Sequence, residues 1–91
     1  MPKSCVHYII TGRVQGVCYR SAAVTEAQKL HLTGWVKNTN NGDVEVLACG
    51  AEQDLKTFEK WLWQGPMLAK VKSVTAKKMS WQEHDSFVIQ Y

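Results

Sequence analysis

The sequence predicts an α+β fold in which one antiparallel sheet carries two helices on one face. The first observation is the spacing of the apolar residues, which along the chain is typical of a strand, a helix, two strands, a helix and a strand, with a short strand at the end. The second is the pair Gly65-Pro66, which ends the second helical segment because proline cannot continue a helix. The third is the length of 91 residues, which allows one small core and therefore one domain over residues 1–91.

The first half of the chain holds a strand, a helix and a hairpin. Residues 5–11 (CVHYIIT) are rich in strand formers, and their alternate side chains share one face. Residues 21–32 (SAAVTEAQKLHL) repeat small apolar residues at helical spacing, which suits close packing on a sheet. Residues 33–39 and 43–50 are typical of two strands. The Asn-Gly pair at 41–42 predicts a type I′ turn between them, because both central residues of that turn need positive φ.

The second half of the chain adds a helix and two strands. Residues 52–64 carry an apolar helical stripe, residues 69–81 alternate as a fourth strand, and residues 86–91 form a short last one. Right-handed connections place the first and third strands in the centre of the sheet, so their apolar faces should lie side by side. The residues expected to face each other are Val6, Tyr8 and Ile10 on one strand and Val44, Val46 and Ala48 on the other. This is the ferredoxin-like split β-α-β arrangement.

Composition and charge restrict the partners. The formal net charge is +3, with 45% apolar and 21% charged residues, which is typical of a soluble globular domain. No apolar run approaches the roughly 20 residues that cross a bilayer, and the N-terminus lacks the apolar region of a signal peptide. We therefore expect a cytoplasmic protein with no membrane partner. The lysines of residues 70–78 are expected to form a solvated strand face, so we predict no nucleic-acid partner.

Residues 12–20 (GRVQGVCYR), between the first strand and the first helix, predict a phosphate site. Backbone N–H groups at a helix N-terminus point outward unpaired, and the helix dipole favours negative charge there. Gly16 allows the loop to curl so that successive N–H groups converge on an anion. Arg20, at the start of the helix, can bind two oxygens of one phosphate through its planar guanidinium.

Other phosphate and metal sites do not match these residues. The loop has neither the G-x-x-x-x-G-K-[ST] pattern of nucleotide P-loops nor the G-x-G-x-x-G of dinucleotide-binding folds. Cys18 precedes Arg20 by two positions, too close for the nucleophile of a cysteine-dependent phosphatase, so we expect it to pack within the loop. The three cysteines show no C-x-x-C spacing and the three histidines are scattered, so no metal site is predicted.

Two segments resemble the signatures of the acylphosphatase family. Residues 12–20 resemble G-[RK]-V-Q-G-V-x-[FY]-R, and residues 34–46 (GWVKNTNNGDVEV) resemble G-[FYW]-V-[RK]-N-x-x-x-G-x-V-E. The order and spacing of the segments agree over nearly all 91 residues, including the glycine–proline pair after the second helix. Cys18 fills a variable position of the first signature.

The resemblance implies an acylphosphatase, an enzyme that hydrolyses the carboxyl–phosphate bond of small acyl phosphates without a metal, a cofactor or a phosphoenzyme. By position in the motifs, Arg20 binds the phosphoryl oxygens and Asn38 orients the attacking water. The backbone amides expected to bind the phosphoryl group are those of Gln15, Gly16, Val17, Cys18 and Tyr19. Inorganic phosphate or sulfate is the expected competitive ligand, and a monomer the expected state. The acyl group stays open: carbamoyl, acetyl and 1,3-bisphosphoglycerate-type substrates all agree with the motifs.

Two alternatives share this topology. An RNA-binding module would stack bases on aromatic residues of its third strand, but residues 43–50 (DVEVLACG) have no aromatic and two acids. A non-catalytic regulatory or maturation domain is the second alternative, because acylphosphatase-like domains also occur inside larger carbamoyl-transferring proteins. A chain of 91 residues with its own initiating methionine favours the free enzyme.

The strand register predicts a disulfide between Cys5 and Cys49. When Tyr8 faces Val46, Cys5 lies directly opposite Cys49, on the sheet face away from the helices. Directly opposed strand residues have Cα atoms about 4.5–5.5 Å apart, within reach of a disulfide. Thiols are usually free in the reducing cytosol, so we predict the bond in oxidised purified protein and leave its state in the cell open. Cys18 should stay unpaired.

Overall fold

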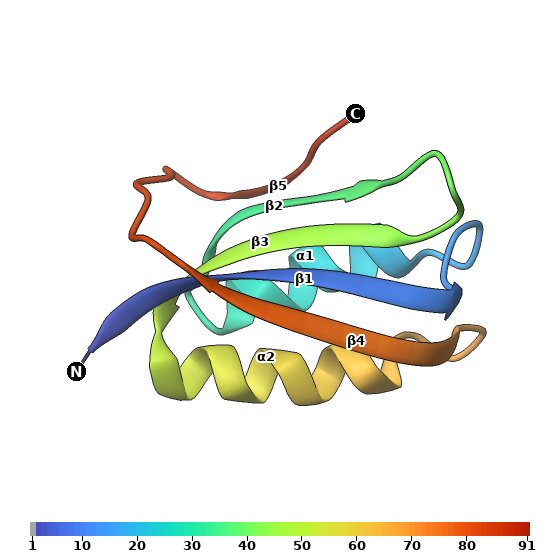
Figure 1. The fold of residues 1–91 in the computed structure, drawn as a ribbon, viewed down its shortest axis with the longest axis horizontal. Coiled ribbons are helices and arrows are strands. Elements are labelled where there is room, and N and C mark those ends of the chain that lie inside the picture. Colours follow the sequence, from blue (N-terminus) through green and yellow to red (C-terminus); the bar gives the residue numbers. More distant parts are fainter. Residues whose placement is uncertain (1) are drawn as a thin grey trace.

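The computed structural model describes residues 2–91 as a five-stranded sheet with two helices on one face (Figure 1). Its elements in chain order are β1 (Lys3–Arg13), α1 (Tyr19–Lys29), β2 (Thr33–Asn38), β3 (Val44–Ala51), α2 (Glu52–Gln64), β4 (Lys70–Met79) and β5 (Phe87–Ile89). The predicted order of elements is therefore confirmed. No helix in this part of the chain is both long and apolar enough to span a membrane.

The sheet has the strand order β4-β1-β3-β2-β5, with β1 and β3 paired side by side as predicted. All neighbouring strands are antiparallel except β2 and β5, which are parallel, so the prediction of a wholly antiparallel sheet is wrong at this edge. After β4 the chain crosses one end of the sheet and reaches the far edge running in the direction of β2 (Figure 1). Backbone hydrogen bonds from Gly34 N–H to Ser86 O (3.0 Å) and from Gln90 N–H to Val36 O (2.9 Å) hold it there.

The core lies between the sheet and the helices. In the register of β1 and β3, Tyr8 is opposite Val46, as predicted, and both are buried together with Ile10, Val44 and Ala48, whereas Val6 is half-buried. From the other layer, α2 buries one stripe of apolar side chains, namely Leu55, Phe58 and Leu62. The small residues Ala23 and Ala27 of α1 are fully buried, which lets this helix approach the sheet closely.

The two helices differ in how well the sequence predicted their ends. Helix α2 covers the predicted residues 52–64 and ends at Gly65, whereas α1 is shifted from the predicted 21–32 to Tyr19–Lys29. It ends early because His31 takes a left-handed φ of 56°. The amides of His31 and Leu32 then bond back to Gln28 O (3.1 Å) and Ala27 O (3.0 Å), the Schellman pattern that usually has glycine at the left-handed position.

The turn between β2 and β3 is not the predicted type I′ turn. Within residues 2–91, the non-glycine residues with positive φ are Cys18 and His31, so Asn41 does not have the required conformation. The hairpin instead has a three-residue loop, residues 40–42, closed by Gly42 at a φ of 95°. The Thr39 hydroxyl explains the difference, because it accepts a hydrogen bond from the Asp43 amide (3.1 Å) and so lengthens the turn by a residue.

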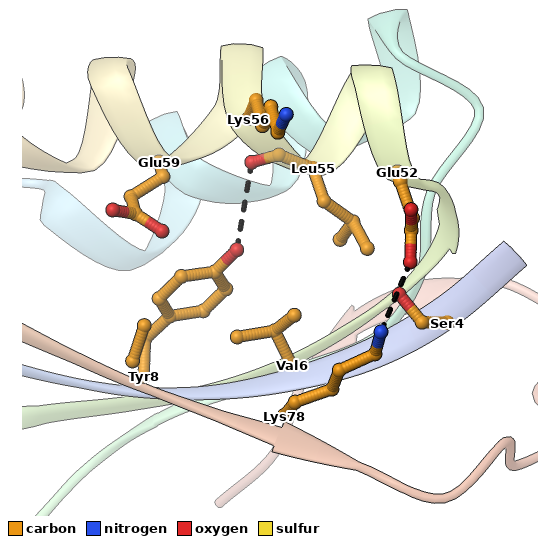
Figure 2. A pocket seen from close by; sticks show the side chains of 9 residues that line it. Ser4, Val6, Tyr8, Glu52, Leu55, Lys56, Glu59 and Lys78 are labelled. Atoms are coloured by element: carbon orange, nitrogen blue, oxygen red, sulfur yellow. Dashed lines mark hydrogen bonds and ion pairs between the residues drawn. The ribbon is translucent and has the colours of Figure 1, made fainter.

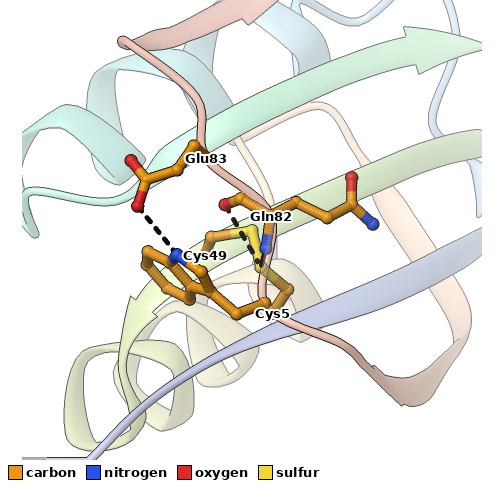
Figure 3. Close-up of a disulfide and its surroundings, with 5 residues drawn as sticks. Cys5, Cys49, Gln82 and Glu83 are labelled. Atoms are coloured by element: carbon orange, nitrogen blue, oxygen red, sulfur yellow. Dashed lines mark hydrogen bonds between the residues drawn. A yellow bond between two sulfur atoms is a disulfide. The ribbon is translucent and has the colours of Figure 1, made fainter.

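A disulfide joins Cys5 to Cys49 across the two central strands, as the register predicts (Figure 3). The Cα atoms are 4.0 Å apart, and both residues are buried on the sheet face away from the helices, next to Leu47. Gln82, in the segment after β4, passes over the bond and donates its backbone N–H to Cys5 Sγ at 3.3 Å. Cys18 is free, also as predicted.

Candidate active site

The loop after β1 and the end of β2 meet at one end of the sheet (Figure 1). Residues of both segments line one pocket there. The pocket has a volume of about 340 Å³. Its lining residues are Val14, Gly16, Cys18, Tyr19, Arg20, Ser21, Asn38 and Ile89. The structure therefore brings both predicted catalytic residues, Arg20 and Asn38, to the same pocket as three of the five predicted loop residues.

The loop backbone presents a row of unpaired N–H groups. Gly16 and Cys18 both have left-handed φ, of 74° and 63°, and this alternation with Val17 curls the chain. Gly16 is suited to this conformation because it has no Cβ. Across residues 2–91, no protein atom accepts a hydrogen bond from the amides of residues 15–19. A curled chain with free N–H groups is the arrangement that binds anions.

Arg20 lies in the first turn of α1, whose N-terminus has no side-chain cap and no acidic residue. Such a terminus leaves several amides unsatisfied and carries the positive end of the helix dipole. Within the described part of the chain, no carboxylate lies at ion-pair distance from Arg20, and its guanidinium is 5.5 Å from the centre of the Tyr91 ring. The charge of Arg20 is therefore available to an anionic ligand.

Asn38 is the last residue of β2 and pairs with Val44 of β3. Its Oδ1 atom is buried and accepts no hydrogen bond from any residue among 2–91. Burying an amide oxygen without a partner costs free energy, so such an atom marks a place where a further donor is expected. Because Asn38 lines the pocket, that donor can be a bound water molecule.

Tyr19 anchors the start of α1 to the opposite helix. Its buried hydroxyl donates a 2.6 Å hydrogen bond to Leu62 O in α2, and its ring packs on Trp61 at 5.5 Å. Burial raises the pKa of the Tyr19 phenol above its usual value, so the hydroxyl stays protonated and keeps donating. This contact explains why α1 begins at Tyr19, and it sets the position of Arg20, the next residue.

One prediction about the loop side chains is wrong, and the structure adds a contact that was not predicted. Cys18 is exposed at the start of α1 and does not pack within the loop as expected. Gln15 and Val17 do not line the pocket, and the Val17 side chain is buried in the core. The Gln15 side chain has a contact that sequence reasoning missed: its Nε2 donates to Thr39 O and to Asp43 O, both at 2.8 Å.

None of the predicted catalytic or phosphate-binding residues lines the other clefts found among residues 2–91. A cleft of about 360 Å³ lies between α2 and the strands β1 and β4 (Figure 2). There the Tyr8 hydroxyl donates to Leu55 O at 3.5 Å, and Lys78 pairs with Glu52 at 3.1 Å. In the described chain, no three His, Cys, Asp or Glu side chains come together as metal ligands could.

Comparison with known proteins agrees with the geometry of the site. The family model described as acylphosphatase matches residues 6–89. An acylphosphatase of Vibrio parahaemolyticus is 44% identical, with 98% of this chain and 99% of the relative covered. The structure of an acylphosphatase from Coxiella burnetii superimposes with a TM-score of 0.94 at 38% identity, covering 97% of this chain and 93% of that chain. The crystal structure of acylphosphatase from Bacillus subtilis gives a TM-score of 0.93 at 39% identity, covering 96% and 98%.

Proposed function

The chain belongs to the acylphosphatase family and is an enzyme that hydrolyses acyl phosphates, and from this premise we propose how its own residues perform the reaction. The phosphoryl group binds in the pocket after β1, where the guanidinium of Arg20 and the backbone amides of residues 15–19 hold its oxygens. Asn38 orients the water molecule that attacks phosphorus. The observation that carries the proposal is that one pocket is lined by residues of the loop with free amides, by Arg20 with its unpaired guanidinium and by Asn38 with its unpartnered amide oxygen.

The reaction requires mainly stabilisation of the negative charge on the phosphoryl oxygens in the transition state. The leaving group of an acyl phosphate is a carboxylate, a weak base, so no strong general acid is needed to expel it. Phosphoryl transfer passes through a loose transition state with charge spread over the phosphoryl oxygens, where positioning and electrostatic stabilisation supply most of the catalysis. Preorganised N–H groups and a guanidinium provide that stabilisation without rearranging during the reaction. These residues need no metal to act.

Asn38 has a positioning role toward the nucleophile. Its Oδ1 accepts one hydrogen of the water, which points a lone pair of the water oxygen at phosphorus. As the new P–O bond forms, the P–O bond to the acyl group breaks and the carboxylate leaves with the electron pair. The proton of the water passes to a phosphoryl oxygen and leaves with the phosphate. An amide suits this role because it holds water without itself taking the proton.

Hydrolysis of acetyl or benzoyl phosphate, measured with EDTA present, tests the proposal. The wild-type protein should hydrolyse both compounds, and Arg20→Ala should lose activity because the guanidinium is the charged side chain that lines the pocket. Arg13→Ala is the matched control, since Arg13 lies at the end of β1 but outside the pocket. Wild-type turnover in Arg20→Ala, or complete inhibition by EDTA, would contradict the mechanism.

The alternative of a non-catalytic regulatory or RNA-binding module is not favoured. The strand β3 (Val44–Ala51) has no aromatic side chain on which a base could stack. We also propose that the enzyme acts as a cytoplasmic monomer of one domain, with no nucleic-acid partner. Sedimentation of the purified protein tests the oligomeric state, and a species of twice the 10.3 kDa chain mass would contradict it.

A further inference from the structure

We propose that the Gln15 side chain is a positioning residue that sets the distance between the phosphate-binding loop and Asn38. This inference rests on the proposed function, because it concerns the two halves of that site. Gln15 lies in the loop, directly before Gly16, but its side chain points away from the phosphate pocket and binds the β2–β3 hairpin. The first family signature has glutamine at this position, and the hydrogen bonds of the structure reveal what its side chain contacts.

The two hydrogen bonds reach both strands of the hairpin. Nε2 of Gln15 donates one bond to Thr39 O and one to Asp43 O, each at 2.8 Å, and so uses both amide hydrogens. Thr39 directly follows Asn38 in the chain, and Asp43 directly precedes Val44, the residue paired with Asn38. The glutamine therefore holds the hairpin at the carbonyls of the two residues next to the Asn38–Val44 pair.

Few other hydrogen bonds fix the position of the β2–β3 hairpin relative to the phosphate-binding loop. Thr39 N–H bonds to Asp43 O at 2.9 Å, which closes the base of the turn, but this bond lies within the hairpin and does not tie it to the loop. Among the side-chain hydrogen bonds of residues 2–91, those of Gln15 are the ones that join residues 14–18 to the hairpin. Without them, the loop and the end of β2 could shift relative to each other.

Catalysis depends on that relative position. The loop holds the phosphoryl group, Asn38 holds the water, and the reaction requires the two to meet in line at the contact distance. A misplacement of about 1 Å can cost about 100-fold in rate. The Gln15 side chain touches neither reacting group, so the loss of its side-chain amide should lower kcat while the backbone amides of the loop and Arg20 still bind phosphate.

Gln15→Met tests this, because methionine has a similar length but no hydrogen-bond donor. We expect kcat for benzoyl phosphate to fall about 10- to 100-fold, while the inhibition constant of inorganic phosphate changes by less than about twofold. Gln15→Glu should be at least as impaired, since its carboxylate would face two carbonyl oxygens. Gln28→Met is the matched control: its Nε2 donates to Phe87 O at 3.5 Å, away from the pocket, and kcat should be unchanged.

A double-mutant cycle separates positioning from general loosening of the loop. In the Asn38→Ala background, Gln15→Met should lower kcat by less than about twofold further, because Gln15 acts through Asn38. If the two losses multiply, or if phosphate affinity falls in parallel with kcat, Gln15 supports the loop itself and the proposal is wrong.

A measurement without turnover distinguishes this proposal from the proposed function. In ¹⁵N-labelled wild-type protein, phosphate binding should shift the resonances of residues 16–19 and also those of Thr39 and Asp43, hairpin residues that bind the Gln15 side chain and do not line the pocket. In Gln15→Met the loop shifts should remain and the hairpin shifts should disappear, whereas Gln28→Met should keep both. Full activity in Asn38→Ala would overturn the proposed mechanism and with it the catalytic effect of Gln15, while the resonance shifts would still report whether Gln15 couples the loop to the hairpin. Hairpin shifts that persist in Gln15→Met would overturn the coupling alone.

Discussion

Reduction of the Cys5–Cys49 disulfide should destabilise the fold strongly. The bond joins residues separated by 44 positions in the sequence. In the chain-entropy treatment of crosslinks, a loop of this length restricts the unfolded chain by about 4 kcal/mol at 25 °C. In the folded state both cysteines are buried against Leu47, and the reduced thiols would remain there as small apolar groups. The loss should therefore arise mainly from the greater freedom of the unfolded chain.

Urea unfolding followed by tryptophan fluorescence, with and without a phosphine reductant, measures the effect. A small protein has an m value of about 1–3 kcal/mol/M in urea, so the midpoint should fall by at least about 1 M on reduction. The m value should rise, because the uncrosslinked unfolded chain exposes more surface. Thiol titration under denaturing conditions verifies the states: one thiol, that of Cys18, before reduction and three after it.

Two controls make the result decisive. Cys18→Ser should show the same dependence on reductant, because Cys18 is free and lies at the opposite end of the sheet. The double variant Cys5→Ala/Cys49→Ala should resemble the reduced protein and should not respond to reductant. If oxidised and reduced proteins, each verified by thiol count, unfold at the same urea concentration, the reasoning from loop entropy is wrong.

Three other outcomes are expected. Asn38→Ala should lower kcat about 100-fold, by analogy with deletion of an oxyanion-hole donor, while phosphate still inhibits at the wild-type concentration; a loss of phosphate affinity instead would show that Asn38 binds the ligand. Inorganic phosphate should raise KM for benzoyl phosphate without lowering kcat, and a purely noncompetitive pattern would place it outside the pocket. Tyr19→Phe should reduce the free energy of unfolding by about 1–3 kcal/mol, because the buried Leu62 carbonyl loses its 2.6 Å hydrogen bond; an unchanged urea midpoint would contradict this.

Features that depend on hydrophobic periodicity could be predicted from the sequence. Helix α2 covers the predicted residues because its apolar stripe and the following Gly65-Pro66 are local signals. The register of β1 with β3 could also be predicted from the alternation of apolar residues, since a shift by one residue would turn every apolar side chain of a strand away from the core. The position of Cys5 opposite Cys49 therefore follows from the pattern of apolar residues in the two strands.

Predictions failed where the backbone conformation or the strand direction depends on a single side chain or on a segment distant in the sequence. The Thr39 hydroxyl binds the Asp43 amide and changes the expected turn. His31 adopts a left-handed conformation that is usual for glycine, because the helix end is satisfied by bonds back to Ala27 and Gln28. The strand β5 pairs in parallel with β2 because of where the crossing chain arrives, and periodicity contains no information about strand direction.

By itself, the sequence determined which residues are available to the site. The glycine-containing loop, the arginine at the helix start and the family motifs identified Arg20, Asn38 and the loop amides. Only the tertiary structure decided how these groups meet. The Gln15 side chain binds carbonyls 24 and 28 positions away, and Asn38 Oδ1 is buried without a protein partner. Both facts depend on the distance between β1 and the hairpin, which is set by packing across the sheet, and a side-chain amide can bind any carbonyl that packing brings within its reach.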